Sequence, residues 1–369
     1  MNEGHRRPVV VVLPGDGIGP EVTAAGLAVL ASAAKRFGLE YTCREMPFGG
    51  RAVDLEGEPF PEATRRACLE ADAVLMGAVG GPAWDKLPAE LRPERGLLAI
   101  RRELGAYANV RPIRLPPALV RLSPLRPEIV EGGLDIVFVR ELTGGLYFGP
   151  KRRIPPAAGE DPASEAAEDV MRYSAAEVRR VAEVAFALAA GRSGRLVSVD
   201  KENVLACSRL WRETVTRVAE AWPRVALEHM YVDNCAMQLV KNPRRFDVIL
   251  TENTFGDILT DLGGAIVGSL GLCPSASLGG RAGLYEPVHG SAPDIAGRGT
   301  ANPVGSILSV AMMLRHTFGR EDAARAVESA VDRVLTAGRL TADLGGSVGT
   351  AEFGRYVAEE VARGDNRGV

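Results

Sequence analysis

Residues 9–22 read VVVVLPGDGIGPEV, an apolar run followed by glycines at positions 15, 17 and 19 and then by Pro20. The apolar run predicts a buried strand, and Pro20 suits the first turn of a helix, where its missing N–H group costs nothing. A dinucleotide fingerprint needs its third glycine one residue later than Gly19, and a P-loop needs a Gly-Lys-Ser/Thr ending. We therefore interpret the glycines as a sharp turn between strand and helix rather than as a phosphate cradle.

Apolar runs and helical periodicities alternate along the rest of the chain. Buried strands are predicted within residues 71–80, 134–142, 194–201, 225–232 and 245–253, and helices within 20–37, 174–191, 205–222 and 302–319. The last helix is expected to have Asn302 as its cap and Pro303 in its first turn. This alternation predicts an α/β protein with largely parallel sheets. Residues 149–170, rich in Pro, Ala and Glu, are predicted to form a surface arm.

The composition is that of an ordinary globular protein. The chain has 369 residues, of which 46% are hydrophobic and 25% charged, and its formal net charge is −3. This length favours two domains. Because there is neither a basic surplus nor an apolar run of ~20 residues, we expect no nucleic-acid or membrane partner. The five cysteines form no CxxC pair, which argues against zinc and disulfides and fits a reducing cytoplasm.

Two acids in the segment TENTFGDILTDLGG, residues 251–264, are candidate metal ligands. A strand is expected to end at Glu252, and a turn with Gly256 to lead into a helix. Asp257 and Asp261 are four residues apart, so they share one helical face and suit a hard ion such as Mg²⁺ or Mn²⁺. Asp233 follows another strand in the same way. A solvated helix face is the alternative, but the neighbouring residues are glycines and apolar side chains rather than lysines.

Three arginines are candidate substrate-binding residues. Arg101 lies on a predicted helix, Arg111 precedes a proline and is therefore extended, and Arg140 ends a buried strand. If they converge, they would hold a substrate with two carboxylates; separate structural salt bridges are the alternative. Tyr147, beyond a turn at Gly144-Gly145, could serve as an acid or simply pack.

Two further segments carry candidate functional groups. Lys201 follows a buried strand, and a lysine held near a metal can act as a base, although one at a strand end is often solvated. Residues 284–303 read LYEPVHGSAPDIAGRGTANP, and a loop this long in a compact domain is typically functional. Asp294 within it could accept hydrogen bonds from both ribose hydroxyls of a nucleotide. An ordered surface loop is the alternative.

Taken together, these motifs resemble one family. The segments LPGDGIGPEV, PERGLLAIR, NVRP, VRELTGGLYFG, YVDNCAMQLV, NTFGDILTDLGG and YEPVHGSAPDIAGRGTANP look like motifs of the β-decarboxylating dehydrogenases, which include isocitrate and isopropylmalate dehydrogenases. The resemblance runs from about Val9 to the C-terminal helix. It implies a two-domain isopropylmalate dehydrogenase-like α/β fold that is not a classical Rossmann fold. The implied domains are residues 1–107 with 268–369 on the cofactor side, and 108–267 with the metal, the dimer interface and an arm at 149–173.

The resemblance also implies roles for individual residues. The substrate would be bound by Arg101, Arg111, Arg140, Leu97, Leu98 and Glu94. Asp257 and Asp261 would bind the metal together with Asp233 of the partner subunit in a homodimer. Lys201 of the partner subunit would take the hydroxyl proton, and Tyr147 would protonate the enolate. NAD would be contacted by His289, Gly290, Ser291, Ala292, Asp294 and Asn302.

The implied reaction is the NAD-dependent oxidation and decarboxylation of 3-isopropylmalate to 4-methyl-2-oxopentanoate, within leucine biosynthesis in the cytoplasm. Leu97 and Leu98 precede Arg101 on the same helical side and could form an apolar wall for the isopropyl group, or belong to the core. The alternatives are isocitrate, homoisocitrate, tartrate or D-malate dehydrogenases of the same family. A non-catalytic regulatory paralogue is disfavoured, because every implied catalytic and metal-binding position is occupied.

Overall fold

The computed structural model describes residues 6–364, which divide into two compact units. The first comprises residues 6–135 and 263–364, and the second comprises Ile136–Leu262. The domain bounds that the resemblance implies, at 107 and 268, stay a prediction.

The first unit contains a sheet with the strand order β2-β1-β3-β12-β11-β4. Its strands are β1 (Val9–Gly15), β2 (Thr42–Glu45), β3 (Ala73–Ala78), β4 (Ala108–Leu115), β11 (Pro274–Leu278) and β12 (Gly283–Pro287). β1 pairs in parallel with β2 and β3, and β3 pairs in parallel with β12. β11 is antiparallel to both of its neighbours.

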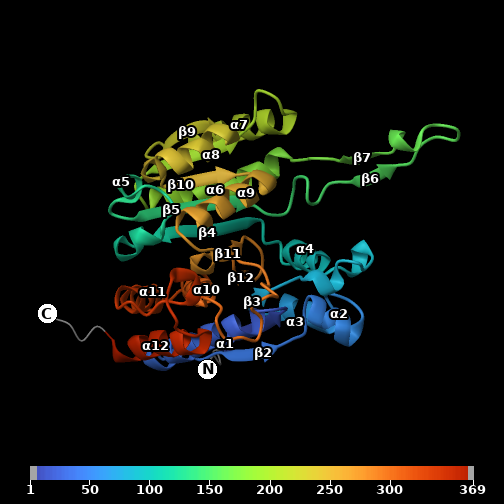
Figure 1. Ribbon diagram of the computed structural model, residues 1–369. Helices are drawn as coiled ribbons and strands as arrows, with labels where there is room; N and C mark the ends of the chain where they lie inside the picture. The colour runs from blue at the N-terminus through green and yellow to red at the C-terminus, as the bar shows by residue number, and fades with distance from the viewer. Residues whose placement is uncertain (1–5, 365–369) are drawn as a thin grey trace, which may run out of the picture. The chain divides into compact units, whose positions relative to one another are not determined.

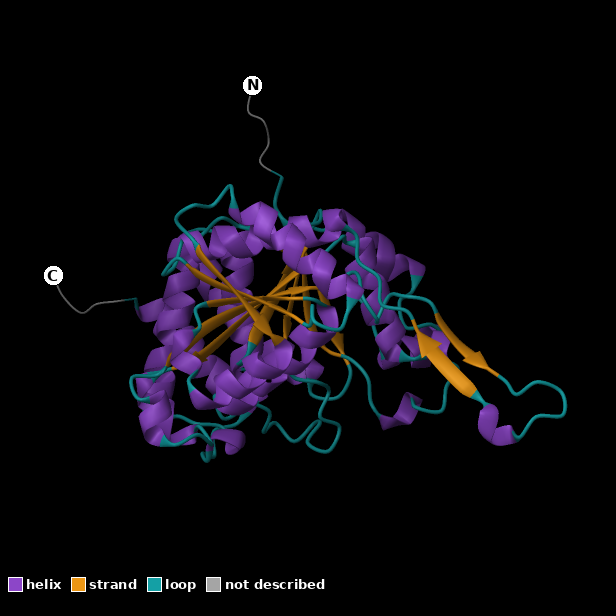
Figure 2. Cartoon of the chain, turned by 90° about the horizontal axis from the view of Figure 1, so that it is seen from above, coloured by secondary structure: helices purple, strands orange, loops and turns teal. Residues whose placement is uncertain are grey.

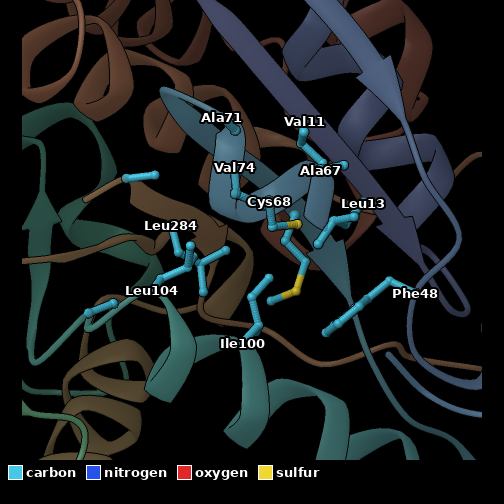
Figure 3. Packing of buried hydrophobic residues seen from close by; sticks show 13 residues of the cluster. Val11, Leu13, Phe48, Ala67, Cys68, Ala71, Val74, Ile100, Leu104 and Leu284 are labelled. Carbon is cyan, nitrogen blue, oxygen red and sulfur yellow. The ribbon is translucent and has the colours of Figure 1, made fainter. Parts of the chain in front are cut away.

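Helices of the first unit pack on one another and on this sheet. They are α1 (Gly19–Phe37), α2 (Gly50–Glu56), α3 (Glu62–Glu70), α4 (Pro93–Glu103), α5 (Pro127–Val130), α10 (Val304–His316), α11 (Glu321–Thr336) and α12 (Thr350–Arg363). α1 lies beside α10 and α12 (Figure 1). Buried side chains of β1, β3, α3 and α4, among them Leu13, Cys68 and Ile100, form one hydrophobic cluster (Figure 3).

The second unit contains four parallel strands in the order β5-β10-β8-β9. These strands are β5 (Leu134–Glu141), β8 (Arg195–Asp200), β9 (Ala226–Tyr231) and β10 (Val248–Thr251). The helices are α6 (Ala175–Ala190), α7 (Ala206–Ala219), α8 (Val232–Lys241) and α9 (Asn253–Ile266), the last of which continues into the first unit. α6 and α7 pack on each other and on β8. The capping box of Ser174 and Glu177 begins α6 as its sequence predicts.

Residues 149–170 form the predicted surface arm. β6 (Lys151–Ile154) and β7 (Ala166–Asp169) pair as an antiparallel hairpin that projects from the second unit (Figures 1 and 2). Every residue of both strands is exposed.

Two local predictions are wrong. α9 already begins at Asn253, so Gly256 lies inside the helix rather than in a preceding turn. A Cβ at position 256 would lie 2.3 Å from Oγ1 of Thr251, so the glycine lets the helix pack closely on the strand end. α10 begins at Val304 with Pro303 as its cap, while the Asn302 side chain accepts a hydrogen bond from the Val304 N–H group. No helix within residues 6–364 is long and apolar enough to cross a membrane.

Candidate active site

Three residues predicted from separate motifs meet in the second unit. Arg140 is buried at the end of β5, and its Nε and Nη2 donate to Oδ1 of Asn253 at 3.0 and 2.7 Å. Its Nη1 pairs with Oδ1 of Asp257. The hydroxyl group of Tyr147 donates to the other carboxylate oxygen of Asp257 at 2.8 Å. Because the carboxyl ends of β5 and β10 lie side by side, a cation, an acid and a phenol are brought into one contact network.

The surroundings of Tyr147 favour its protonated form. Burial, helped by the hydrogen bond to the Asp257 carboxylate, raises the pKa of Tyr147 to about 12. The Arg140 guanidinium, 5.8 Å from the ring centre, opposes this rise without cancelling it. Tyr147 therefore keeps its proton at neutral pH, as a general acid must.

A buried hydrogen-bond network holds this group in place. The Tyr173 hydroxyl donates to Oε2 of Glu252 at 3.0 Å and accepts from the N–H group of Asn253 at 3.0 Å. The Asn253 side chain donates to the carbonyl of Gly144, at the turn that leads to Tyr147. Burial raises the pKa of the Tyr173 hydroxyl and of the Glu252 carboxyl. Asn253 thus connects Arg140 to the chain segment that carries Tyr147.

Lys201 and Asp233 form a second polar group in this unit. Lys201 directly follows β8, Asp233 lies in the first turn of α8, and Nζ is 3.0 Å from Oδ2. The Lys201 ammonium also lies 5.7 Å from the centre of the Tyr231 ring. The hydrogen bond from Lys201 lowers the pKa of Asp233. The Asp233 side chain is 61% exposed and therefore accessible for further contacts.

The donors on α9 fit a divalent cation. Asp257 and Asp261 lie four residues apart, and both are accessible to solvent at least in part. They offer only carboxylate oxygens, which Mg²⁺ and Mn²⁺ prefer. In residues 6–364 of this one chain, no group of three or more His, Cys, Asp or Glu side chains is gathered that could hold a metal ion.

The other two predicted arginines lie in the first unit. Arg101 on α4 is buried and pairs through Nη2 with Oε1 of Glu286 at 2.9 Å. Its buried Nε has no hydrogen-bond partner among the described residues and remains available for a ligand. Arg111 on β4 is buried, and its Nε donates to Oδ1 of Asn109 at 2.6 Å. The convergence of Arg101 and Arg111 with Arg140 stays a prediction.

Three more predicted substrate residues lie on α4. Leu97 is half-buried and packs against the hydrophobic cluster of Figure 3, whereas Leu98 is half-buried but lies outside that cluster. Leu97 is therefore at least partly a core residue, and Leu98 is the better candidate for contact with a ligand. Glu94 is exposed and lies beside Gly80, where a Cβ would be 2.6 Å from its Oε1.

The candidate cofactor residues lie in the loop between β12 and α10, again in the first unit. The carbonyl of Ser291 accepts from the N–H group of Ile18 at 2.8 Å, and Asn302 donates to Asp343 at 3.0 Å. Ala292, between His289 and Asp294, has a φ of +39°, an uncommon conformation for a residue with a Cβ. Burial lowers the pKa of His289, so its ring is neutral at pH 7.

Asp294 is exposed and makes no hydrogen bond or ion pair within residues 6–364. The loop is therefore fixed near both ends and presents free polar groups between them, together with Gly290. These features fit the adenosine part of a dinucleotide.

The family model for isocitrate/isopropylmalate dehydrogenase matches residues 9–357. The chain belongs to the isocitrate/isopropylmalate dehydrogenase family. It is therefore an oxidoreductase, and the predicted fold class is confirmed. The chain is 53% identical to the 3-isopropylmalate dehydrogenase of Moorella thermoacetica over 360 residues, which cover 96% of this chain and 99% of that one. It is 55% identical to the enzyme of the same name from Gloeobacter violaceus over 337 residues, 91% of this chain and 92% of that one.

A solved structure leads to the same family. The crystal structure of isocitrate dehydrogenase from Methylococcus capsulatus superposes with a TM-score of 0.85 at 34% identity, covering 96% of this chain and 99% of that one. Isocitrate/isopropylmalate dehydrogenases are thus similar to this chain in both sequence and fold.

Sequence reasoning missed several polar residues that form hydrogen bonds or ion pairs with the candidate site residues. Asn253 lies next to Glu252, inside the motif that carries Asp257. Two polar residues at the end of an apolar strand could have indicated that Asn253 belongs to the candidate site. Tyr173 and Glu286 had no such signal, because only the tertiary fold brings them to Glu252 and Arg101.

Proposed function

We propose that the protein oxidises and decarboxylates 3-isopropylmalate to 4-methyl-2-oxopentanoate and CO₂, with reduction of NAD, as a step of leucine biosynthesis. The observation that carries the proposal is the contact network of Arg140, Asp257 and Tyr147, which brings together a guanidinium, a carboxylate and a protonated phenol. The 3-isopropylmalate dehydrogenases among the relatives favour this substrate over others in the family. Reduction of NAD by the purified protein with 3-isopropylmalate and Mg²⁺ is the experiment that tests it.

In the proposed reaction, each set of candidate site residues has one role. Arg101, Arg111 and Arg140 bind the two carboxylates of the substrate and so fix which of them departs. Asp257 and Asp261 hold a Mg²⁺ or Mn²⁺ ion, which supplies polarisation of the substrate oxygen when bound. The loop of His289, Gly290, Ser291, Ala292, Asp294 and Asn302 holds NAD, which accepts the hydride.

Two residues move protons in this scheme. Lys201 takes the proton of the substrate hydroxyl while the hydride leaves the same carbon, which gives a β-keto acid. The carbon–carbon bond to the departing carboxylate then breaks, CO₂ leaves, and the electron pair remains as an enolate. Tyr147 donates its proton to the enolate carbon.

We propose that the enzyme is a homodimer whose subunits share their active sites. The elements that carry Lys201, Asp233 and Asp257 also expose large apolar side chains, namely Val204 at 63%, Met237 at 55%, Val240 at 40% and Ile258 at 64%. Exposed apolar side chains on the elements that carry these polar residues suit a contact between two copies of the chain. Lys201 and Asp233 of the partner subunit would then complete the site at Asp257 and Asp261.

Mixing two inactive variants is expected to restore activity. A heterodimer of a Lys201→Ala chain with an Asp257→Asn chain contains one site with both groups intact. Because random reassortment makes half of the dimers mixed, activity should recover to roughly a quarter of the wild type.

The matched control for this experiment mixes Lys201→Ala with Asp233→Asn. If one subunit supplies both groups, neither site of that heterodimer is complete, and no recovery should occur. Heterodimers that form without restoring activity in the first mixture would place Lys201 and Asp257 of one chain in the same site.

Replacing Leu98 is expected to change substrate choice. If Leu98 contacts the isopropyl group, Leu98→Asn should raise KM for 3-isopropylmalate about tenfold or more and leave KM for D-malate nearly unchanged, because apolar contacts are worth roughly 1–3 kcal/mol of discrimination. Adding Leu97→Asn should enlarge the effect and also lower Tm, since Leu97 packs on the core. Steady-state kinetics with both substrates provides the measurement. Equal losses on both substrates would assign the leucines to the core alone.

A further inference from the structure

A buried carboxylate lies in the glycine-rich turn between β1 and α1, and the chemistry above does not use it. Asp16 is 3% exposed and accepts three backbone hydrogen bonds, each 2.8 Å long. Gly50 and Gly80 donate to Oδ2, and Arg51 donates to Oδ1. Burial raises the pKa of the Asp16 carboxyl, and the three amides oppose this rise. The carboxylate thus joins its own turn to the first turn of α2 and to the turn after β3.

Two glycines in the segments that meet at Asp16 leave little room for a side chain. A Cβ at Gly49, where φ is +69°, would lie 2.6 Å from Oδ2 of Asp16. Gly80 has a φ of +99°, which disfavours residues with a side chain. Each of the three turns is therefore fixed against the same carboxylate, with little room for an alternative arrangement.

The far side of the same turn supports the candidate cofactor loop. The Ile18 N–H group donates to the carbonyl of Ser291 at 2.8 Å. A Cβ at Gly17 would lie 2.0 Å from that carbonyl oxygen, so the two backbones are in direct contact. Ile18 and Val22 form a small buried cluster with Ala301, against which Ala292, Ile295 and Ala296 pack. The turn at residues 15–19 thus packs directly against the candidate cofactor loop and forms a hydrogen bond with it.

We propose that Asp16 is a positioning residue for the cofactor loop, residues 289–302: its carboxylate fixes the glycine-rich turn, and the turn fixes Ser291 and the apolar underside of the loop. The inference rests on the proposed function, in which this loop binds the adenosine part of NAD. A residue such as Ala292 keeps an uncommon backbone conformation only where its surroundings determine it. When only a fraction of the molecules has the loop conformation that binds the ligand, the apparent affinity for the ligand falls by that fraction.

The test measures ADP-ribose binding by calorimetry on the full-length protein, with wild type, Asp16→Asn and Asp72→Asn. In Asp16→Asn the new amide group must face at least one of the three backbone donors, so the Kd for ADP-ribose should rise about tenfold or more. Amide hydrogen exchange within residues 289–302 should become faster, and KM for NAD should rise more than kcat falls. Asp72→Asn is the matched control, because Asp72 accepts the N–H group of Val9 at the opposite end of β1. Its Kd should stay within about twofold of the wild type.

Three results would contradict the proposed role of Asp16. A folded Asp16→Asn variant with wild-type affinity and wild-type exchange in the loop would overturn the positioning role. If Asp16→Asn does not fold, Gly17→Ala tests the same link, because its methyl group would push against the Ser291 carbonyl; unchanged ADP-ribose affinity there would also overturn it. A wild type that does not bind ADP-ribose would contradict the proposed cofactor site itself, and the inference with it.

Discussion

Replacing Asp257 with asparagine is expected to lower kcat/KM by about a thousandfold or more, because a metal that polarises the reacting oxygen contributes several kcal/mol. The substitution removes the charge that would hold the divalent cation. It also removes the carboxylate charge that pairs with the buried Arg140 guanidinium. Steady-state kinetics at saturating Mg²⁺, together with Mn²⁺ binding followed by electron paramagnetic resonance, provides the measurement.

The control for Asp257→Asn is Glu228→Gln, which removes a surface carboxylate of the same unit that pairs with Arg245. Exposed ion pairs contribute little, so this variant should keep kcat/KM within about twofold of the wild type. An Asp257→Asn enzyme with near wild-type turnover and undiminished Mn²⁺ affinity would remove Asp257 from the metal site.

The double variant Asp294→Lys with Ile295→Tyr should shift cofactor preference from NAD toward NADP by about two orders of magnitude or more in the ratio of kcat/KM values. Asp294 would accept both ribose hydroxyls of NAD, and its charge would repel the 2′-phosphate of NADP. A lysine and a phenol in its place would bind that phosphate. Losing the charge-assisted bonds and gaining a phosphate partner are each worth roughly 1.5–3 kcal/mol.

The single variant Ile295→Tyr serves as the control for cofactor preference. Ile295 packs on Ile18, Val22 and Ala301, so its replacement alone should weaken both cofactors without reversing their order. The glycine-rich turn supports the loop but should not itself choose between the cofactors. If the double variant kept the NAD preference, the adenosine site would have to lie outside this loop.

The spacing of apolar residues along the chain predicted the fold class, because the side chains that a strand or helix buries recur with the period of that element. Val10, Val11 and Val12 of β1 and the apolar run of β5 are buried as expected. The contacts of Arg140, Tyr147 and Asp257 were within reach of sequence reasoning, since Arg140 lies at the end of β5 and α9 follows β10, and the carboxyl ends of these two strands are neighbours. The arm was predicted as a segment but not as a hairpin, because its exposed strands carry no alternating apolar pattern.

Other features depend on contacts between residues far apart in the chain. The local sequence around Gly256 predicts a turn, yet Gly256 lies inside α9. A glycine is needed at this position because Thr251 and Arg140 leave no space for a side chain. In the sequence, Asp16 is one polar residue in a turn. Its hydrogen bonds with the N–H groups of Gly50 and Gly80 could not be predicted, because these residues come close to Asp16 only in the folded chain. Lys201 and Asp233 follow different strands, and their ion pair depends on the parallel pairing of β8 with β9.

The most direct test of the account is a turnover comparison with the purified full-length protein, NAD and Mg²⁺. 3-Isopropylmalate, isocitrate, homoisocitrate, D-malate and tartrate would each be supplied, with NADH and CO₂ measured together. The account predicts equimolar NADH and CO₂ from 3-isopropylmalate, with a kcat/KM well above that for every other acid. No NADH from 3-isopropylmalate, or a higher kcat/KM with isocitrate or another of these acids, would contradict it.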